Sequence, residues 1–109
     1  MKNSILSGPL NQKKQIPKKY ALYQNYPNPF NPTTVIRYDL PFAGRVDLEI
    51  YNILGQRVKT LVSAYQSAGR KSVVWDGKND AGNLVSSGIY IYRMKTAKFR
   101  KCLKLVVLK

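Results

Sequence analysis

The most constraining stretch of the sequence is a proline run, Tyr26-Pro27-Asn28-Pro29-Phe30-Asn31-Pro32-Thr33-Thr34, here called the proline box. Its three prolines fix φ and remove three backbone donors, so neither a helix nor a central β-strand can pass through it. Asn28 and Asn31 each precede a proline and are therefore biased towards extended or turn geometry. The segment cannot cover the rings of Tyr26 and Phe30 itself, so we expect both rings to dock on a core formed further along the chain. The proline box is therefore predicted to be the rigid start of a folded domain.

Length and composition indicate one domain and a tail. The chain has 109 residues, of which 44% are hydrophobic, enough for a modest core. Its net charge of +14, from 19 Lys and Arg against 5 Asp and Glu, favours acidic partners such as nucleic acid, anionic lipid, lipopolysaccharide or acidic protein. With no histidine and only one cysteine, Cys102, the chain has neither an internal disulfide framework nor a His/Cys zinc site.

Residues 1–19 are predicted to be a disordered basic leader. They contain lysines and two prolines without apolar periodicity. A basic arm for nucleic acid is the alternative, but no aromatic residue is interleaved with these lysines. The apolar run after Lys2 ends within two residues, so neither a signal peptide nor a transmembrane helix fits. If the domain works outside the cytoplasm, we expect the export signal on a longer precursor.

Alternating apolar residues predict strands over most of the remaining chain. Two of these, residues 34–40 and 45–51, are separated by a Pro-Gly turn and are predicted to form a hairpin. A short strand at 57–62 precedes a loop at 63–69 with room for one helical turn. Further strands are expected at 71–76, 89–95 and 99–109, and Trp75 is expected at the centre of packing. About seven short strands with glycine-rich and proline-rich turns predict an all-β, antiparallel β-sandwich.

The sequence offers little to support catalysis. Acid–base catalysis most often uses histidine, and the chain has none. Asp76 and Asp80 share a turn whose spacing is similar to a calcium loop, but Lys78 stands where a third oxygen ligand is needed. Bonds from these side chains to the turn backbone are therefore the favoured interpretation. Cys102 has no histidine to activate it. We expect a non-enzymatic domain with no metal, cofactor or small-molecule substrate.

Two groups of residues leave alternatives open. Tyr38, Tyr90 and Tyr92 could form a stacking platform for single-stranded nucleic acid, but their β spacing favours core packing. The last predicted hairpin holds seven cations and no acid, which suggests either a surface for an acidic partner or a solvated face with protective edge lysines. These cations are Arg93, Lys95, Lys98, Arg100, Lys101, Lys104 and Lys109.

The run from Leu22 to Thr34 closely resembles the opening box of the type A C-terminal sorting domains of the type IX secretion system. Further markers follow in the family's order, and the resemblance covers residues 20–109. Similar sequences are also grouped with the Ig-like domain of flagellar hook-capping proteins. The markers are Tyr51–Gln56, Gly69, Val74–Gly77, Asp80–Gly82, Ser87–Arg93 and the terminal motif Lys104-Leu105-Val106-Val107-Leu108-Lys109.

The resemblance implies an Ig-like sandwich over residues 20–109 that acts as a sorting signal. Such a domain directs a fused cargo through the translocon to the cell surface or exterior. A sortase commonly removes it, here within the leader before Tyr20, and attaches the cargo to anionic lipopolysaccharide. By the same resemblance the terminal motif faces the translocon, Gly55 is the glycine of the family's turn motif, and Leu105 stands where the family often has methionine. A structural or adhesive Ig-like module, as in hook-capping proteins, is the alternative; nucleic-acid binding through the positive charge is a third hypothesis.

Overall fold

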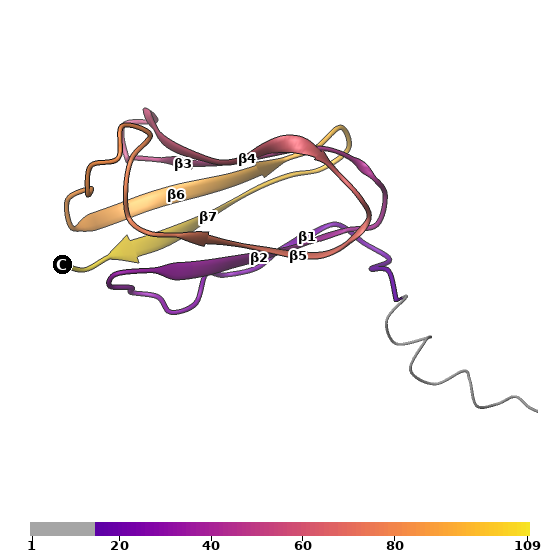
Figure 1. Ribbon diagram of the computed structural model, residues 1–109, viewed down its shortest axis with the longest axis horizontal. Coiled ribbons are helices and arrows are strands. Elements are labelled where there is room, and N and C mark those ends of the chain that lie inside the picture. The colour runs from indigo at the N-terminus through magenta and orange to yellow at the C-terminus, as the bar shows by residue number, and fades with distance from the viewer. Residues whose placement is uncertain (1–14) are drawn as a thin grey trace, which may run out of the picture.

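The computed structural model describes residues 15–109 as seven strands in two antiparallel sheets (Figure 1). Of the predicted leader, residues 1–14 lie outside the described part. One sheet has the strand order β1-β2-β5 and the other β4-β3-β6-β7. The predicted all-β, Ig-like sandwich is therefore confirmed. The strands are β1 (Ala21–Leu22), β2 (Thr34–Leu40), β3 (Gly44–Tyr51), β4 (Arg57–Gln66), β5 (Gly69–Trp75), β6 (Gly88–Lys95) and β7 (Arg100–Val107).

The predicted hairpin between β2 and β3 is wrong, because these strands belong to different sheets. β2 pairs with β1 and β5, whereas β3 pairs with β4 and β6. The turn at residues 41–43 carries the chain from one sheet to the other. Alternation shows that each strand has one buried face, and two such faces can meet across a sandwich as well as lie side by side in one sheet. The hairpin predicted at the end of the chain, β6 with β7, does form.

The predicted inner faces form the core. Trp75 is completely buried between the sheets, and its ring lies 5.4 Å from that of Phe30 and 6.0 Å from that of Tyr90. Its indole Nε1 donates a hydrogen bond to the Lys78 carbonyl at 2.9 Å, so the ring also holds the turn that follows β5. Other fully buried side chains from both sheets are Ile36, Tyr38, Leu40, Val46, Leu48, Ile50, Tyr92, Met94 and Leu105.

Strand β4 is longer than predicted. It runs without a break through residues 63–66, where the sequence pattern indicated a loop or a helical turn. Register shifts relative to β3 fall at Leu48/Glu49 and Ile50/Tyr51. Such irregularities insert an extra residue into one strand and interrupt the regular alternation of side chains. Beyond these shifts, residues 63–66 pair with β3 in regular register, and this pairing extends a strand that the local pattern does not reveal.

Alternation along β2 places Asp39 on the face opposite Tyr38 and Leu40, yet Asp39 is only 6% exposed. Tyr23, just after β1, lies over it and donates a hydrogen bond from its hydroxyl to Asp39 Oδ2. Arg70 of β5 adds an ion pair at 3.4 Å. The hydrogen bond to Asp39 is the main cause that raises the pKa of the Tyr23 phenol. The burial of Asp39 depends on β1 pairing with β2, which alternation within β2 cannot show.

The strands run between two ends of the sandwich (Figure 1). The C-terminal end carries the turn at residues 52–56, the loop at 76–87, the proline box and the chain terminus. The leader end carries Tyr20 and the turns at 41–43, 67–68 and 96–99. These two names are kept below.

Candidate signal site at the C-terminal strand

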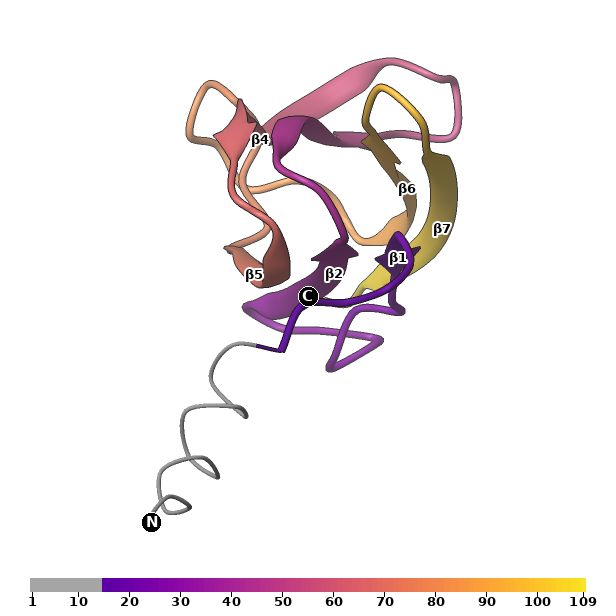
Figure 2. The ribbon, with the colours of Figure 1, turned by 90° about the vertical axis from the view of Figure 1, so that its right-hand side faces the viewer.

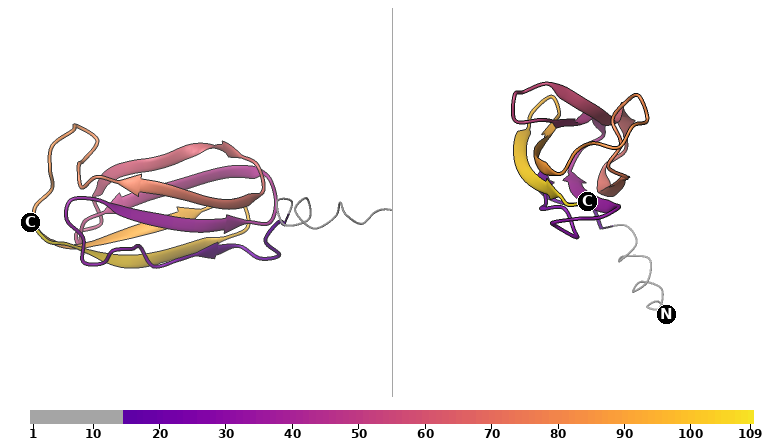
Figure 3. Two further views of the ribbon diagram at one scale, coloured as in Figure 1. Left: turned by 60° about the horizontal axis from the view of Figure 1, so that its bottom comes forward. Right: turned by 90° about the vertical axis from the view of Figure 1, so that its left-hand side faces the viewer.

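The proline box lies against the free edge of β7, the strand that contains most of the terminal motif (Figure 3). The Phe30 amide donates to the Val106 carbonyl at 3.1 Å, and the Leu108 amide donates to the Phe30 carbonyl at 3.1 Å. Phe30 and Val107 thereby form a parallel bridge. The box and the terminal motif stand at opposite ends of the domain's sequence, but the fold joins them.

Side chains extend this cover along the edge. The Val106 amide donates to Asn28 Oδ1 at 2.9 Å, and Gln24 Nε2 donates to the Lys104 carbonyl at 2.7 Å. Beyond the strand, the Lys109 amide donates to Ser87 Oγ at 3.0 Å. An uncovered edge strand is a template for pairing with another chain. On β7 the segment before β2 already bonds to this edge, so the edge is not available for pairing with another chain.

Buried polar side chains hold the proline box in place. Asn25 donates from Nδ2 to Thr34 Oγ1 at 2.9 Å and to the Pro27 carbonyl at 3.1 Å, and Thr34 Oγ1 also donates to that carbonyl. The Asn25 amide donates to the Tyr92 hydroxyl at 2.9 Å, which in turn donates to the Tyr23 carbonyl at 2.7 Å. Because prolines supply no donor, side chains take the place of a backbone ladder here. Sequence reasoning did not single out Asn25; a polar residue just before a donor-poor segment is the pattern that could have found it.

The two aromatic rings of the box behave differently. Phe30 is 2% exposed and docks on Trp75, as expected. The prediction that Tyr26 docks is wrong, because its side chain is 70% exposed. Tyr26 exchanges two backbone hydrogen bonds with Val35, at 3.0 and 2.9 Å, so its attachment is through the main chain. The peptide bonds before Pro27, Pro29 and Pro32 are cis.

The terminal motif alternates between buried and exposed side chains. Leu105 and Val107 are buried in the core, whereas Lys104, Lys109 and Leu108, at 52% exposure, face outward. Beside the chain terminus lies an apolar hollow of about 200 Å³. Its lining includes Phe30, Pro32, Gly77, Leu84, Val107 and Leu108. The motif thus combines a buried strand with an exposed apolar and cationic tip.

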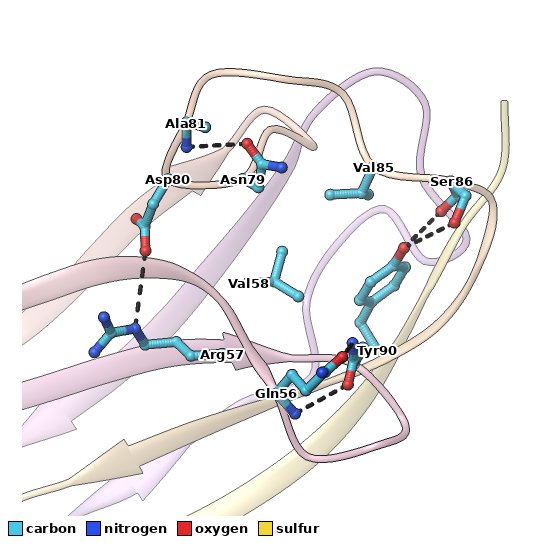
Figure 4. Close-up of a pocket in the computed structure, with 10 residues that line it drawn as sticks. Gln56, Arg57, Val58, Asn79, Asp80, Ala81, Val85, Ser86 and Tyr90 are labelled. Carbon is cyan, nitrogen blue, oxygen red and sulfur yellow. Dashed lines mark hydrogen bonds and ion pairs between the residues drawn. The ribbon is translucent and has the colours of Figure 1, made fainter.

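The turn that contains Gly55 lies at the same end. Gly55 has a positive φ of 82°, and Asn52 Oδ1 accepts hydrogen bonds from the amides of Leu54 and Gln56. A hollow of about 720 Å³ separates this turn from the loop at 79–86 (Figure 4). Its polar side chains bond mainly to one another: Arg57 pairs with Asp80 at 3.8 Å, and the Tyr90 hydroxyl donates to the Ser86 carbonyl. These contacts organise the loops.

The side-chain oxygens of the suspected calcium loop accept hydrogen bonds from backbone amides of the turn and of β4. Asp76 Oδ1 accepts the Lys78 amide, and Asn79 Oδ1 accepts the amides of Ala81 and Asn83. Asp80 Oδ1 accepts the Thr60 amide. The Asp76 bond is a turn bond of the predicted kind, whereas the prediction is wrong for the Asp80 side chain, which bonds to β4 and not to the turn. Among residues 15–109, no three His, Cys, Asp or Glu side chains gather as metal ligands.

The remaining candidates fall into core and surface positions. Tyr38, Tyr90 and Tyr92 are buried, as the core interpretation predicted. Cys102 is a free, exposed cysteine on the outer face of β7. Arg93 is not a free cation, because it forms an ion pair with Glu49 of β3 at 3.1 Å and lies 5.1 Å from the centre of the Tyr51 ring. No helix in the part of the chain that the structure describes could cross a membrane.

The fold and the covered C-terminal strand define the class of protein, an Ig-like β-sandwich module. More specifically, the model of the FlgD Ig-like domain family matches residues 32–98. The chain therefore belongs to the FlgD Ig-like domain family. No curated protein matches the chain.

Solved structures with this fold come from larger proteins. Dimeric latent PorU from Porphyromonas gingivalis matches with a TM-score of 0.66 and 18% identity, over 83% of this chain and 9% of that one. PorZ from the same organism, an essential bacterial surface component of the type IX secretion system, matches with a TM-score of 0.54 and 19% identity, over 83% and 11%. FlgD from Pseudomonas aeruginosa matches with a TM-score of 0.54 and 29% identity, over 68% and 58%. The chain thus spans only part of each of these proteins.

Replacing Gly55 tests whether its turn depends on backbone conformation alone. A Cβ at Gly55 would meet no atom within 4 Å, so steric crowding by neighbours is absent. Gly55→Ala should lower the free energy of unfolding by about 1 kcal/mol because alanine disfavours positive φ. Gly55→Asn should lower the free energy of unfolding by less, since asparagine tolerates a positive φ better than alanine does. Urea unfolding of both variants provides the measurement, and equal losses would contradict the explanation.

Because the phenol of Tyr92 is buried, we expect the folded domain to lose stability at alkaline pH. Burial raises its pKa to about 12, from about 10 in an unfolded chain. Stabilisation of the neutral phenol is complete below the unfolded pKa and declines as the pH rises from about 10 to about 12, because the unfolded chain ionises first. The urea midpoint should therefore fall over this range. Tyr92→Phe should start less stable but show a flatter decline, and parallel pH curves for the two proteins would argue against the assignment.

Proposed function

We propose that this domain is a non-enzymatic C-terminal sorting module of the type IX secretion pathway, exported with a fused cargo to the cell surface or exterior. In this proposal the translocon binds the terminal motif and a sortase cleaves before Tyr20. Any contact with anionic lipopolysaccharide is made through the processed cargo. Neither nucleic acid nor a small molecule is a partner in this role.

The observation that carries the proposal is the covered terminal strand. Leu108 and Lys109 project from β7 beside an apolar hollow, while Phe30 and Asn28 of the proline box hold the strand's edge. The ordered resemblance to type A sorting domains supports the same role for these residues. The fold shared with PorZ, a surface component of the type IX system, adds support at the level of architecture.

The arrangement suggests how such a motif could be presented. The sandwich keeps Leu105 and Val107 buried, so the partner would first meet the exposed tip, Leu108 and Lys109. An aliphatic side chain next to a cation offers both apolar contact and charge to a partner. The covered edge keeps β7 from pairing with other chains before that encounter.

The test is secretion of a reporter fused in front of the full chain, behind a signal peptide, in a host with the pathway. Removing only Leu108 and Lys109 leaves the buried residues of β7 in place, so folding should survive and secretion should be lost. Deleting Leu105–Lys109 should also abolish secretion, with unfolding as a further cause. Ile53→Ala, which removes an exposed aliphatic side chain at the same end but outside the hollow, is the control and should be secreted. Normal secretion of a folded two-residue deletion would refute the proposal.

A structural or adhesive Ig-like module is the second candidate, favoured by membership of the FlgD Ig-like family and by the likeness to FlgD itself. This role does not need a free C-terminus. A short tag appended after Lys109 should therefore be harmless for a structural module, whereas it should block secretion by a sorting module. The same fusion experiment distinguishes the two.

A further inference from the structure

We propose that the leader end of the sandwich is a docking surface for an anionic lipid bilayer. This inference is independent of the proposed contact between the terminal motif and the translocon, which uses the opposite end of the domain. It rests on the joint placement of unpaired cations and exposed aromatic rings on turns that the fold brings together.

Three turns and the last residues of the leader meet at this end, onto which Figure 2 looks. The rings of Tyr20 and Phe99 stack with their centres 5.4 Å apart, which ties the leader to the β6–β7 turn. Tyr20 also lines a small hollow of about 50 Å³ together with Phe42 of the β2–β3 turn and Thr96. The pairing of Gly44 with Gln66 places the β4–β5 turn at the same end.

Positive charge exceeds negative charge at the leader end. Two carboxylates are close: Asp39 is paired with Arg70, and Asp47 is paired with Arg45 while facing Lys95 across the strands. The other three acids lie towards the C-terminal end. Within residues 15–109, the ion pairs leave six exposed cations of the leader end unpaired: Lys18, Lys19, Lys95, Lys98, Arg100 and Lys101.

Exposed apolar side chains stand among these cations. Phe42, on the β2–β3 turn, is 66% exposed, and Tyr65, opposite Arg45 in the strand register, is 75% exposed. Ile16 of the leader is also exposed. Aromatic rings surrounded by lysine and arginine suit the boundary between lipid head groups and acyl chains. The C-terminal end differs, because its exposed aliphatics Ile53, Leu54 and Leu84 accompany Asp76 and Asp80.

A bilayer fits this surface better than nucleic acid does. Single-stranded nucleic acid binds along a basic groove in which aromatic rings stack successive bases. At the leader end Phe42 lies on the β2–β3 turn and Tyr65 lies on strand β4, so the two rings stand on separate segments, and the hollow beside Phe42 is too small for a base. Cations near an anionic membrane each strengthen binding about fivefold, and an apolar ring adds affinity that salt does not screen.

The test is sedimentation of the full chain with vesicles of phosphatidylcholine and phosphatidylglycerol, with pure phosphatidylcholine vesicles as the neutral reference. The triple variant Lys98→Gln, Arg100→Gln, Lys101→Gln should bind anionic vesicles about a hundredfold more weakly. The matched control Lys59→Gln, Lys78→Gln, Lys109→Gln loses the same charge from elsewhere and should bind within a few-fold of the parent. Equal weakening by both triples would mean that only net charge matters and would overturn the proposal.

Phe42→Ser tests the apolar part of the surface. Since Phe42 is exposed, folding should be unchanged, and binding to anionic vesicles should weaken about tenfold with the same salt dependence. No effect of Phe42→Ser would refute membrane insertion, and binding to single-stranded DNA but not to anionic vesicles would overturn the proposal in favour of nucleic acid. Reporter secretion is a separate measurement, so failure here leaves the sorting proposal untouched.

Discussion

Replacing Trp75 by alanine should lower the free energy of unfolding by about 3–5 kcal/mol, the largest effect expected from a single substitution in this domain. The indole is completely buried at the point where the proline box, β5 and β6 meet, against the rings of Phe30 and Tyr90. Its removal leaves a cavity between two sheets that cannot easily collapse. It also leaves the Lys78 carbonyl without its donor. For a small domain, whose total stability is about 5–15 kcal/mol, this is a large fraction.

Thermal and urea unfolding followed by far-ultraviolet circular dichroism provide the measurement, since the variant lacks tryptophan fluorescence. The midpoint temperature should fall by about 15–30 °C. Val74→Ala, at the exposed neighbouring position on β5, is the control and should change stability by less than about 1 kcal/mol. A loss below about 1 kcal/mol for Trp75→Ala would contradict its place at the centre of packing.

Phe30→Ala should lower the free energy of unfolding by about 3 kcal/mol. It should also weaken the contact between the proline box and the edge of β7. The ring is buried against Trp75, but it also borders the apolar hollow beside the chain terminus. Part of the space left by the ring is therefore continuous with an existing hollow. We accordingly expect a loss of stability in the lower part of the range for replacing a buried phenylalanine by alanine. Because the Phe30 backbone bonds to Val106 and Leu108, loss of its anchor should free the edge of β7.

Hydrogen exchange detects this second effect. In Phe30→Ala, the amides of Val106 and Leu108 should exchange much faster than the core amides of β3, since the groups that accept them belong to the box. Tyr26→Ala is the matched control, as it removes an exposed ring from the same box and should change stability by less than about 0.5 kcal/mol. Similar losses in the two variants would contradict the packing explanation.

The fold class was predictable because strand alternation and turn composition are local properties. Val46, Leu48 and Ile50 lie at alternate positions, and all three are buried as predicted. The positive φ of Gly55 likewise follows from its position in a short turn. The alternation of apolar residues also has limits. It predicts that the strand β4 ends at Val62, whereas pairing with β3 extends the strand to Gln66.

The candidate site was predictable only in its parts. Proline chemistry marked the box, and the resemblance marked the terminal motif, but no local pattern places Phe30 beside Val107. Asn25 is decisive for holding the box, yet its role depends on Tyr92 of a strand in the other sheet. The ion pair between Arg93 and Glu49 likewise requires β3 to lie next to β6, so one of the seven cations of the last hairpin has an acidic partner outside that hairpin.

Three properties of the domain follow from its sequence alone: which residues can be buried, where the chain must turn, and that a proline-rich segment opens the domain. These properties depend on the chemistry of residues that are neighbours in the sequence, so they can be inferred from the sequence directly. The tertiary structure alone decided that β2 and β3 separate into two sheets, that Tyr23 covers Asp39, and that the proline box covers the terminal strand. Each of these depends on contacts between segments far apart in the sequence, whose energies exist only once both segments are in place.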